Sequence, residues 1–140
     1  MVQQHYVYIR KQITKCCWLL IVGGNVMDRK YIENWLDILK ESWLNKNSNK
    51  VASLFTNTNF YQETPFLTPY TKYEEVAKEW ENIDNQDIKK LEFKILAIED
   101  KTVIVNWIFQ RDGTEFDGIY EIKFNDNNEC IYFKSWEMEK

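Results

Sequence analysis

The chain has 140 residues, a typical length for one domain, and its apolar fraction of 44% is sufficient for one hydrophobic core. Its formal net charge of −4 disfavours a nucleic-acid-binding protein, which would present a basic surface to phosphates. Six tryptophans, eight tyrosines and eight phenylalanines predict a core or a pocket walled by large, flat side chains.

The histidine and cysteine content excludes several kinds of site. The single histidine, His5, lies far upstream of the patterned chain, so catalytic Ser-His-Asp or Cys-His sets and histidine-based metal sites lack their usual residues. Cys16, Cys17 and Cys130 form neither a disulfide framework nor a C-x-x-C motif. We therefore expect reduced thiols and a cytoplasmic location.

A glycine pair follows an apolar run, as in a phosphate-binding loop. Gly23 and Gly24 lack the third glycine and the Lys-Ser/Thr pair that such a loop requires. The sequence therefore predicts no nucleotide, no metal and no other cofactor.

Charge divides the chain into two parts. Residues 1–27 carry a charge of +3 and residues 28–140 a charge of −7, which predicts a basic N-terminal extension followed by a single acidic domain. The extension has three interpretations: an appended or mis-assigned segment with Met27 as the true start, an added β-strand at Tyr6–Ile9, or a signal segment. The apolar run Cys16–Val22 is too short to span a membrane.

The first half of the acidic domain has helical periodicity. Asp28 is a candidate N-cap for a first helix, whose apolar residues recur at three- and four-residue steps from Ile32 to Trp43. A short second helix follows the polar stretch 45–49 and ends near Phe55. The capping box Thr71–Glu74 predicts a third helix that reaches Trp80.

The second half alternates with the period of β-strands. A strand is expected at residues 56–63, ending before Pro65, and a long antiparallel meander at residues 91–95, 102–111, 116–124 and 130–138. Arg111–Thr114 is a hairpin signal, and residues 125–128 form another turn. This order predicts an α+β fold with helices packed on one face of a curved antiparallel sheet.

This order, with the motifs in it, resembles the nuclear transport factor 2-like superfamily, also called SnoaL-like, across residues 28–138. The resemblance rests on Leu54–Phe55, Tyr61–Phe66, Tyr73–Trp80, Phe124–Asp126 and Phe133–Trp136. It implies a cone-shaped half-barrel, also described as cystatin-like, with the curved sheet wrapped around N-terminal helices. It also implies a mostly apolar cavity at the open end of the cone and often a homodimer formed through the sheet.

The resemblance extends to ketosteroid isomerases, which use an Asp base and an oxyanion hole of Tyr and protonated Asp. Matching the motifs puts Thr64 at the position of the base, Leu39 at the tyrosine and Tyr120 at the protonated aspartate. Threonine is no base near neutral pH and leucine donates no hydrogen bond. Steroid isomerisation by that mechanism is therefore not expected.

The expected pocket combines aromatic walls with a few polar groups. We predict that strand parity places Phe60, Gln62 and Thr64 inward on the first strand. The predicted ligand-binding residues are Gln62, Thr64, Trp107, Phe109, Tyr120 and Ser135. The alternative is a core filled by Trp107, Phe109 and Phe133. The inward direction of Ser135 conflicts with that of the neighbouring Trp136 and stays open.

Glu63 is the sharpest catalytic candidate, with Tyr120 as a second one. Simple alternation points Glu63 outward, toward solvent or a dimer contact; only a bulge would turn it inward, where desolvation would raise its pKa. Ile104, Ile108 and Ile119 form a candidate dimer surface.

Three functions follow. The first is a domain that binds a small, mostly apolar molecule without evident catalysis, and the second is a small-molecule cyclase, isomerase or dehydratase using Glu63 or Tyr120. The third is a dimeric protein-interaction module. The excess of lysine over arginine, with abundant asparagine and isoleucine, is typical of an AT-rich bacterial genome.

Overall fold

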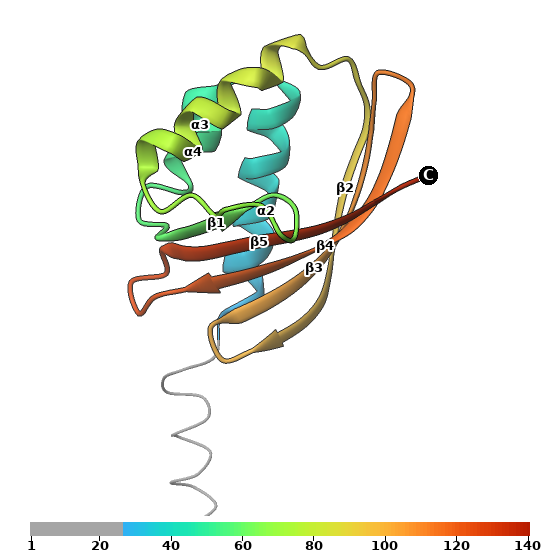
Figure 1. The fold of residues 1–140 in the computed structure, drawn as a ribbon. Coiled ribbons are helices and arrows are strands. Elements are labelled where there is room, and N and C mark those ends of the chain that lie inside the picture. Colours follow the sequence, from blue (N-terminus) through green and yellow to red (C-terminus); the bar gives the residue numbers. More distant parts are fainter. Residues whose placement is uncertain (1–26) are drawn as a thin grey trace, which may run out of the picture.

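The computed structural model describes residues 27–140 (Figure 1). The predictions for residues 1–26, which concern His5, Cys16, Cys17 and the three interpretations of the extension, lie outside the described residues. Met27 packs into the core, and its backbone N–H donates to the Asp100 carbonyl at 2.9 Å.

Helix α2 (Arg29–Leu44) begins where its N-cap was predicted, because the Asp28 carboxylate accepts a hydrogen bond from the Lys30 backbone N–H at 3.0 Å. Its buried stripe is the predicted one and consists of Ile32, Trp35, Leu36, Leu39 and Trp43. Helix α3 (Ser48–Ser53) is short and is followed by the buried Phe55.

Helix α4 (Tyr73–Trp80) continues into the 3-10 helix η1 (Glu81–Asn85). The predicted capping box is wrong: the N-cap is Lys72, which makes no side-chain cap bond. Because the helix starts one residue later than the box requires, the Thr71 side chain is not at the capping position. Val76 and Trp80 are buried as expected.

The sheet has five strands in the order β1-β5-β4-β3-β2. The strands are β1 (Phe60–Gln62), β2 (Ile88–Glu99), β3 (Thr102–Arg111), β4 (Thr114–Phe124) and β5 (Cys130–Glu139). The four long strands form the predicted antiparallel meander. To this antiparallel meander the sheet adds one parallel pair, between β1 and β5.

The first strand is shorter than predicted. Residues 54–57 form turns, and the Thr58 hydroxyl donates to the Cys130 carbonyl at 3.0 Å, so pairing with β5 starts only at Phe60. Beyond Gln62 the chain bends into a loop, which two backbone hydrogen bonds between Tyr61 and Tyr70 close. Phe66, at the tip of this loop, has a φ of 73°.

Register shifts curve the sheet. They occur in β2, between Ile88 and Lys90 and between Ile95 and Ala97, and at the end of β4 next to Phe124. The predicted hairpin between β3 and β4 is confirmed: Asp112 and Gly113 have φ values of 50° and 81°, as a tight two-residue turn requires.

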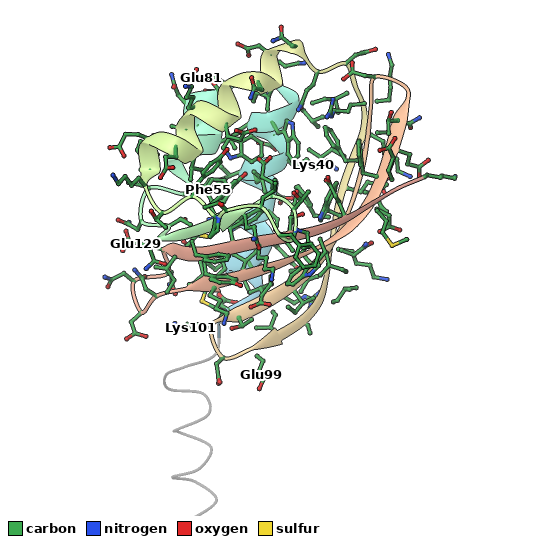
Figure 2. All side chains as sticks on the ribbon, in the orientation of Figure 1. Lys40, Phe55, Glu81, Glu99, Lys101 and Glu129 are labelled. Atoms are coloured by element: carbon green, nitrogen blue, oxygen red, sulfur yellow. The ribbon has the colours of Figure 1, made fainter. Side chains whose placement is uncertain are left out.

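The helices lie on the concave face of this sheet, and the core lies between the two layers (Figure 1). Phe55 projects between the helices and the sheet, whereas Glu99 and Lys101 mark the far turn of the β2–β3 hairpin (Figure 2). Among residues 27–140 no helix is long and apolar enough to cross a membrane.

Candidate functional site

A pocket of about 450 Å³ opens between the concave face of the sheet and the end of the helical layer. Its walls come from the C-terminal part of α2, from α4 and η1, from the loop after β1, and from β3, β4 and β5. Eight aromatic side chains line it: Trp43, Tyr61, Trp80, Trp107, Phe109, Phe116, Tyr120 and Phe133. Trp107, Phe109 and Phe133, which were expected either to fill the core or to line a cavity, are buried in the core and also line the pocket.

The floor of the pocket is a layer of packed rings. Trp107 stacks on Tyr120 with ring centroids 5.2 Å apart, and Tyr120 contacts Phe133 at 4.6 Å. Trp107 lies opposite Gly118 in the β3–β4 register. A Cβ atom on Gly118 would lie 2.5 Å from the Trp107 ring and 2.3 Å from the Trp136 carbonyl oxygen. The absence of a side chain at position 118 therefore lets the Trp107 indole lie flat against β4.

Glu63 lies in the pocket wall. In the β1–β5 register Tyr61 pairs with Phe133, and both are buried on the concave face; Glu63, two residues further on, points to the same side. The predicted parity of the first strand is therefore wrong. Phe60 instead stacks on Tyr132, with centroids 4.5 Å apart, away from the buried Tyr61. Within Phe60–Gln62 the parity was misassigned by one residue; beyond Gln62 the chain bends, and both Glu63 and Thr64 line the pocket.

The surroundings of the Glu63 carboxyl raise its pKa to about 7, first through desolvation and then through the nearby charge of Glu79. The Tyr61 hydroxyl donates a hydrogen bond to Glu63 Oε1 at 3.2 Å, which acts in the opposite direction. Glu63 as a whole residue is exposed, because it lies at the open side of the pocket. The result is a carboxyl group that water and small molecules reach and that titrates near neutral pH.

A second tyrosine–glutamate pair lies beside the first. The Tyr70 hydroxyl donates to Glu79 Oε2 at 3.0 Å, and the Tyr70 ring is nearly parallel to Tyr61 at 6.2 Å. Glu79 lies on α4 and lines the pocket. The two pairs place one carboxylate from the helical layer and one from the loop after β1 in the wall of the same pocket.

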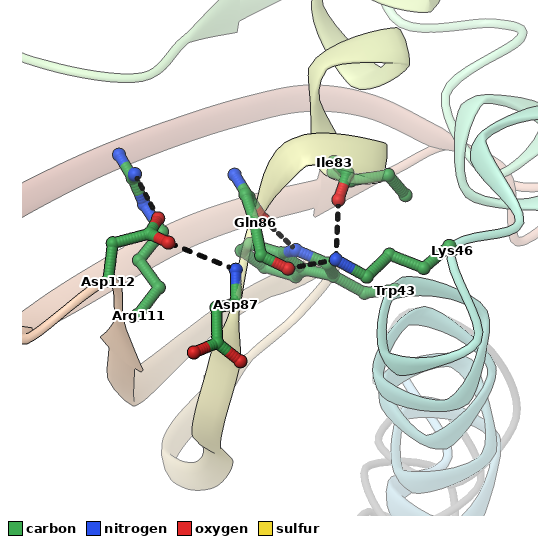
Figure 3. Close-up of polar contacts among 7 residues, drawn as sticks. All are labelled: Trp43, Lys46, Ile83, Gln86, Asp87, Arg111 and Asp112. Carbon is green, nitrogen blue, oxygen red and sulfur yellow. Dashed lines mark hydrogen bonds and ion pairs between the residues drawn. The ribbon is translucent and has the colours of Figure 1, made fainter.

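The rim on the β2–β3 side is fixed by polar contacts (Figure 3). Arg111 pairs with Asp112 at 3.1 Å, and its guanidinium lies 5.6 Å from the centre of the Phe116 ring. Asp112 also accepts a hydrogen bond from the Asp87 backbone N–H at 3.1 Å. Arg111 is therefore held by Asp112 and by the ring of Phe116, and its ion-pair partner is not one of the carboxylates that line the pocket.

A second set of contacts joins the end of α2 to η1. The Trp43 indole N–H donates to Gln86 Oε1 at 2.8 Å, and the Lys46 ammonium donates to the Ile83 carbonyl at 3.0 Å and to the Gln86 carbonyl (Figure 3). These bonds fix Trp43, Ile83 and Gln86, which line the pocket. The Lys46 ammonium is therefore hydrogen-bonded to two backbone carbonyls.

Of the predicted ligand-binding residues, the structure brings five to the pocket wall: Thr64, Trp107, Phe109, Tyr120 and Ser135. Ser135 is buried and lies opposite Tyr120 in the β4–β5 register, so its parity is inward. Gln62 is not in the wall. It is buried on the other side of β1, where its amide N–H donates to the Leu67 carbonyl at 2.6 Å.

Sequence reasoning missed the contribution of the helical layer. Trp43, Trp80, Glu79 and Gln86 line the pocket, as do Arg111 and Glu137 from the strand ends. The aromatic stripe of α2 and α4 indicated that these tryptophans face the sheet, but not that a cavity separates them from it. Within residues 27–140, no group of three or more His, Cys, Asp or Glu side chains is arranged to hold a metal ion.

The fold has many relatives among solved structures, although no protein-family model and no curated protein matches the sequence. A nuclear transport factor 2-like protein of unknown function from Burkholderia xenovorans superposes with a TM-score of 0.64 at 9% identity, over 77% of this chain and 83% of that one. A steroid delta-isomerase from Pseudomonas aeruginosa gives a TM-score of 0.61 at 15% identity, over 80% and 82%.

A third relative is SalBIII, an epoxide hydrolase/cyclase-like enzyme with a role in pyran ring formation in the polyether salinomycin. It superposes with a TM-score of 0.60 at 10% identity, over 76% of this chain and 92% of that one. At such identities the superpositions show a common fold and leave the activity open. Residues 27–140 thus form an α+β cone with the nuclear transport factor 2-like fold.

Proposed function

We propose that the chain binds a small, mostly apolar molecule in the pocket. The observation that carries this proposal is a cavity of about 450 Å³ with a floor of stacked aromatic rings. That volume lies in the range of about 300–1,000 Å³ typical of small-molecule sites. The few polar groups around the floor, among them Thr64, Tyr120 and Ser135, supply hydrogen bonds that orient a ligand.

Thermal-shift screening of a fragment library against the full chain tests the proposal. Ligands that raise the melting temperature should lose their effect in Ser135→Leu, which fills the cavity from its wall. Ser53→Leu is the matched control, because Ser53 is exposed on α3, outside the pocket wall. If no fragment stabilises the protein, or if Ser135→Leu leaves the shifts unchanged, pocket binding is wrong.

The second candidate function is proton-transfer catalysis, as in an isomerase, cyclase or dehydratase, with Glu63 as general base. The specific observation is the Glu63 carboxyl, whose pKa of about 7 suits a base that works near neutral pH. Tyr120, the other catalytic candidate, lines the same pocket as a hydroxyl donor. The fold relationship to a steroid delta-isomerase and to SalBIII is compatible with such chemistry.

The chemistry of those ketosteroid isomerases that use an oxyanion-hole tyrosine is not part of this proposal. Leu39, the residue matched to that tyrosine, is fully buried in α2 and does not line the pocket. A catalytic function would instead need Glu63→Gln to abolish turnover of a bound ligand. If ligands that bind the pocket are never turned over, the binding function stands alone.

We also propose that the chain forms a homodimer through the convex face of the sheet. The described helices cover only the concave face (Figure 1), and Ile104, Ile108 and Ile119 remain partly exposed on the other side. Partly exposed isoleucines in the middle of a sheet are typical of a surface that a second subunit covers.

A further inference from the structure

We propose that the pocket selects a small organic cation, such as a protonated amine joined to an apolar body. This inference rests on the proposed binding function and names the class of its ligand.

The charges in the pocket wall favour a positive ligand. Three carboxylates, those of Glu63, Glu79 and Glu137, line the pocket together with a single guanidinium, that of Arg111. Within residues 27–140 none of the three carboxylates forms a salt bridge, whereas Arg111 pairs with Asp112. Lys46, which lies close behind the wall, is bonded to the carbonyls of Ile83 and Gln86. Glu63 and Glu79 accept hydrogen bonds from tyrosine hydroxyls, but within residues 27–140 no lysine or arginine forms an ion pair with any of the three carboxylates.

These carboxylates also disfavour one another. Glu79 and Glu137 both raise the pKa of Glu63, and the opposing effect of Arg111 is the smallest among the causes. A cationic group placed between them would relieve this repulsion, because an opposite charge stabilises the ionised carboxylate. An anionic ligand would add to the repulsion.

The aromatic walls suit the same ligand. Electron-rich ring faces attract cations, and the rim already shows this contact, since the Arg111 guanidinium lies over Phe116 at 5.6 Å and over Phe109 at 6.0 Å. The stacked Trp107 and Tyr120 rings form an apolar floor for the body of the ligand. The carboxylates of Glu63 and Glu137 lie on exposed residues, toward the opening.

Two tryptophans of the pocket wall have indole N–H groups without an acceptor in the part of the chain that the structure describes. The indole N–H groups of Trp80 and Trp107 have no acceptor within residues 27–140, although both side chains are more than nine-tenths buried and line the pocket. Each of these nitrogens exposes less than 1 Å² of surface, so a ligand that carries an acceptor atom would reach them only after a small shift of the surrounding side chains.

Three probes with one skeleton and different charge test the inference: phenoxypropylamine, phenoxypropanol and phenoxypropanoate. Each contains an aromatic body and an ether acceptor. Isothermal titration calorimetry of the full chain at pH 8 and low salt should show the amine binding about tenfold or more tighter than the alcohol, with the carboxylate weakest. The double variant Glu63→Gln/Glu137→Gln should reduce the preference for the amine over the alcohol to less than about threefold.

Glu99→Gln is the matched control, because it removes one carboxylate at the far end of β2 (Figure 2) and should leave the preference unchanged. If the double variant does not fold, Glu137→Gln alone, at an exposed position of the wall, provides the same comparison. Equal binding of amine and alcohol, tighter binding of the carboxylate, or a preference that survives the substitutions would overturn the cation inference and leave pocket binding intact. Failure of all three probes to bind would count against both.

Discussion

Tyr61 and Glu63 stand two residues apart on one side of the chain at the β1 end of the sheet, and the tyrosine hydroxyl donates a hydrogen bond to the glutamate carboxylate at 3.2 Å. Tyr61 is buried in the core, while Glu63 extends from the same side into the pocket. A core residue therefore holds the carboxyl group that gives the pocket its chemical character.

Tyr61→Phe should raise the pKa of Glu63 further above its value of about 7, because the hydroxyl stabilises the ionised carboxylate. We expect the pKa to rise by roughly 0.5–1, since a hydrogen bond at this exposed residue contributes about 1 kcal/mol and one pKa unit corresponds to about 1.4 kcal/mol. Carboxyl-carbon NMR titration measures it. Tyr132→Phe is the control, because Tyr132 stacks on Phe60 outside the pocket wall. An unchanged pKa would show that the Tyr61–Glu63 bond does not form in solution.

Glu63→Gln should make the protein more stable at alkaline pH and change little in acid. The folded-state pKa of about 7 lies above the ordinary value of 4.5, so the folded state holds the proton more tightly than the unfolded chain. The stability that this tighter proton binding gives the folded state is fully present below about pH 4.5 and is lost as pH rises through about 7. Because the residue is partly solvated, we expect a gain of about 1 kcal/mol at pH 8.

Chemical denaturation at pH 4.5 and pH 8 measures this difference. Glu92→Gln is the control, because it removes a carboxylate from an exposed position of β2 outside the pocket wall. A Glu63→Gln variant that is destabilised equally at both pH values would contradict the raised pKa.

Gly118→Ala should destabilise the fold by about 1–3 kcal/mol, because overpacking of a filled site forces neighbouring groups to move. The new Cβ would lie 2.3 Å from the Trp136 carbonyl oxygen, which is backbone, and 2.5 Å from the Trp107 ring. Displacement of Trp107 should also change tryptophan fluorescence and weaken the binding of any ligand in the pocket.

Gly113→Ala provides the comparison for this substitution. Gly113 has a φ of 81° and open space around it, so alanine there is strained by its backbone alone and should leave the fluorescence unchanged. Equal effects of the two substitutions on fluorescence would contradict the proposal that Gly118 makes room for the Trp107 ring.

Ile108→Lys should convert the proposed homodimer to a monomer without loss of the fold. Ile108 lies on the convex face, opposite Asp117 in the β3–β4 register, and a charge there cannot be buried against a second subunit without a large cost. Light scattering coupled to size-exclusion chromatography gives the mass of each form. Glu41→Lys, exposed on α2, should leave the mass unchanged. A wild-type chain that is monomeric at high concentration contradicts the proposal.

The meander could be predicted from the sequence because its signals are long or chemically specific. The alternation of Val103, Val105, Trp107 and Phe109 runs through a whole strand, and Asp112 and Gly113 both adopt the positive φ that their turn requires. The N-cap Asp28 was equally clear, because its carboxylate bonds to the first turn of α2.

The parity of β1 could not be read in the same way. The strand has three residues, and two neighbouring aromatic side chains, Phe60 and Tyr61, fit either face. Its pairing with β5 decides the question, and that pairing joins segments far apart in the sequence. This pairing fixes the side on which Tyr61 lies, and Glu63 follows in the bend after the strand, where it lines the pocket.

The contribution of α4 and η1 to the pocket was hidden for a related reason. Trp80 and Val76 were recognised as a buried stripe, but whether a buried tryptophan fills a core or borders a cavity depends on the distance between two layers. The capping-box prediction was wrong because Thr71 and Glu74 have the right spacing, but the N-cap of the helix is Lys72.

The most direct measurement is a crystal structure of the full chain with the fragment that stabilises it most. We predict that the fragment lies in the pocket, with its apolar part against Trp107 and Tyr120 and a polar group within hydrogen-bond distance of the Glu63 carboxyl. A pocket closed by its own aromatic side chains, or a fragment bound elsewhere on the surface, would contradict the account.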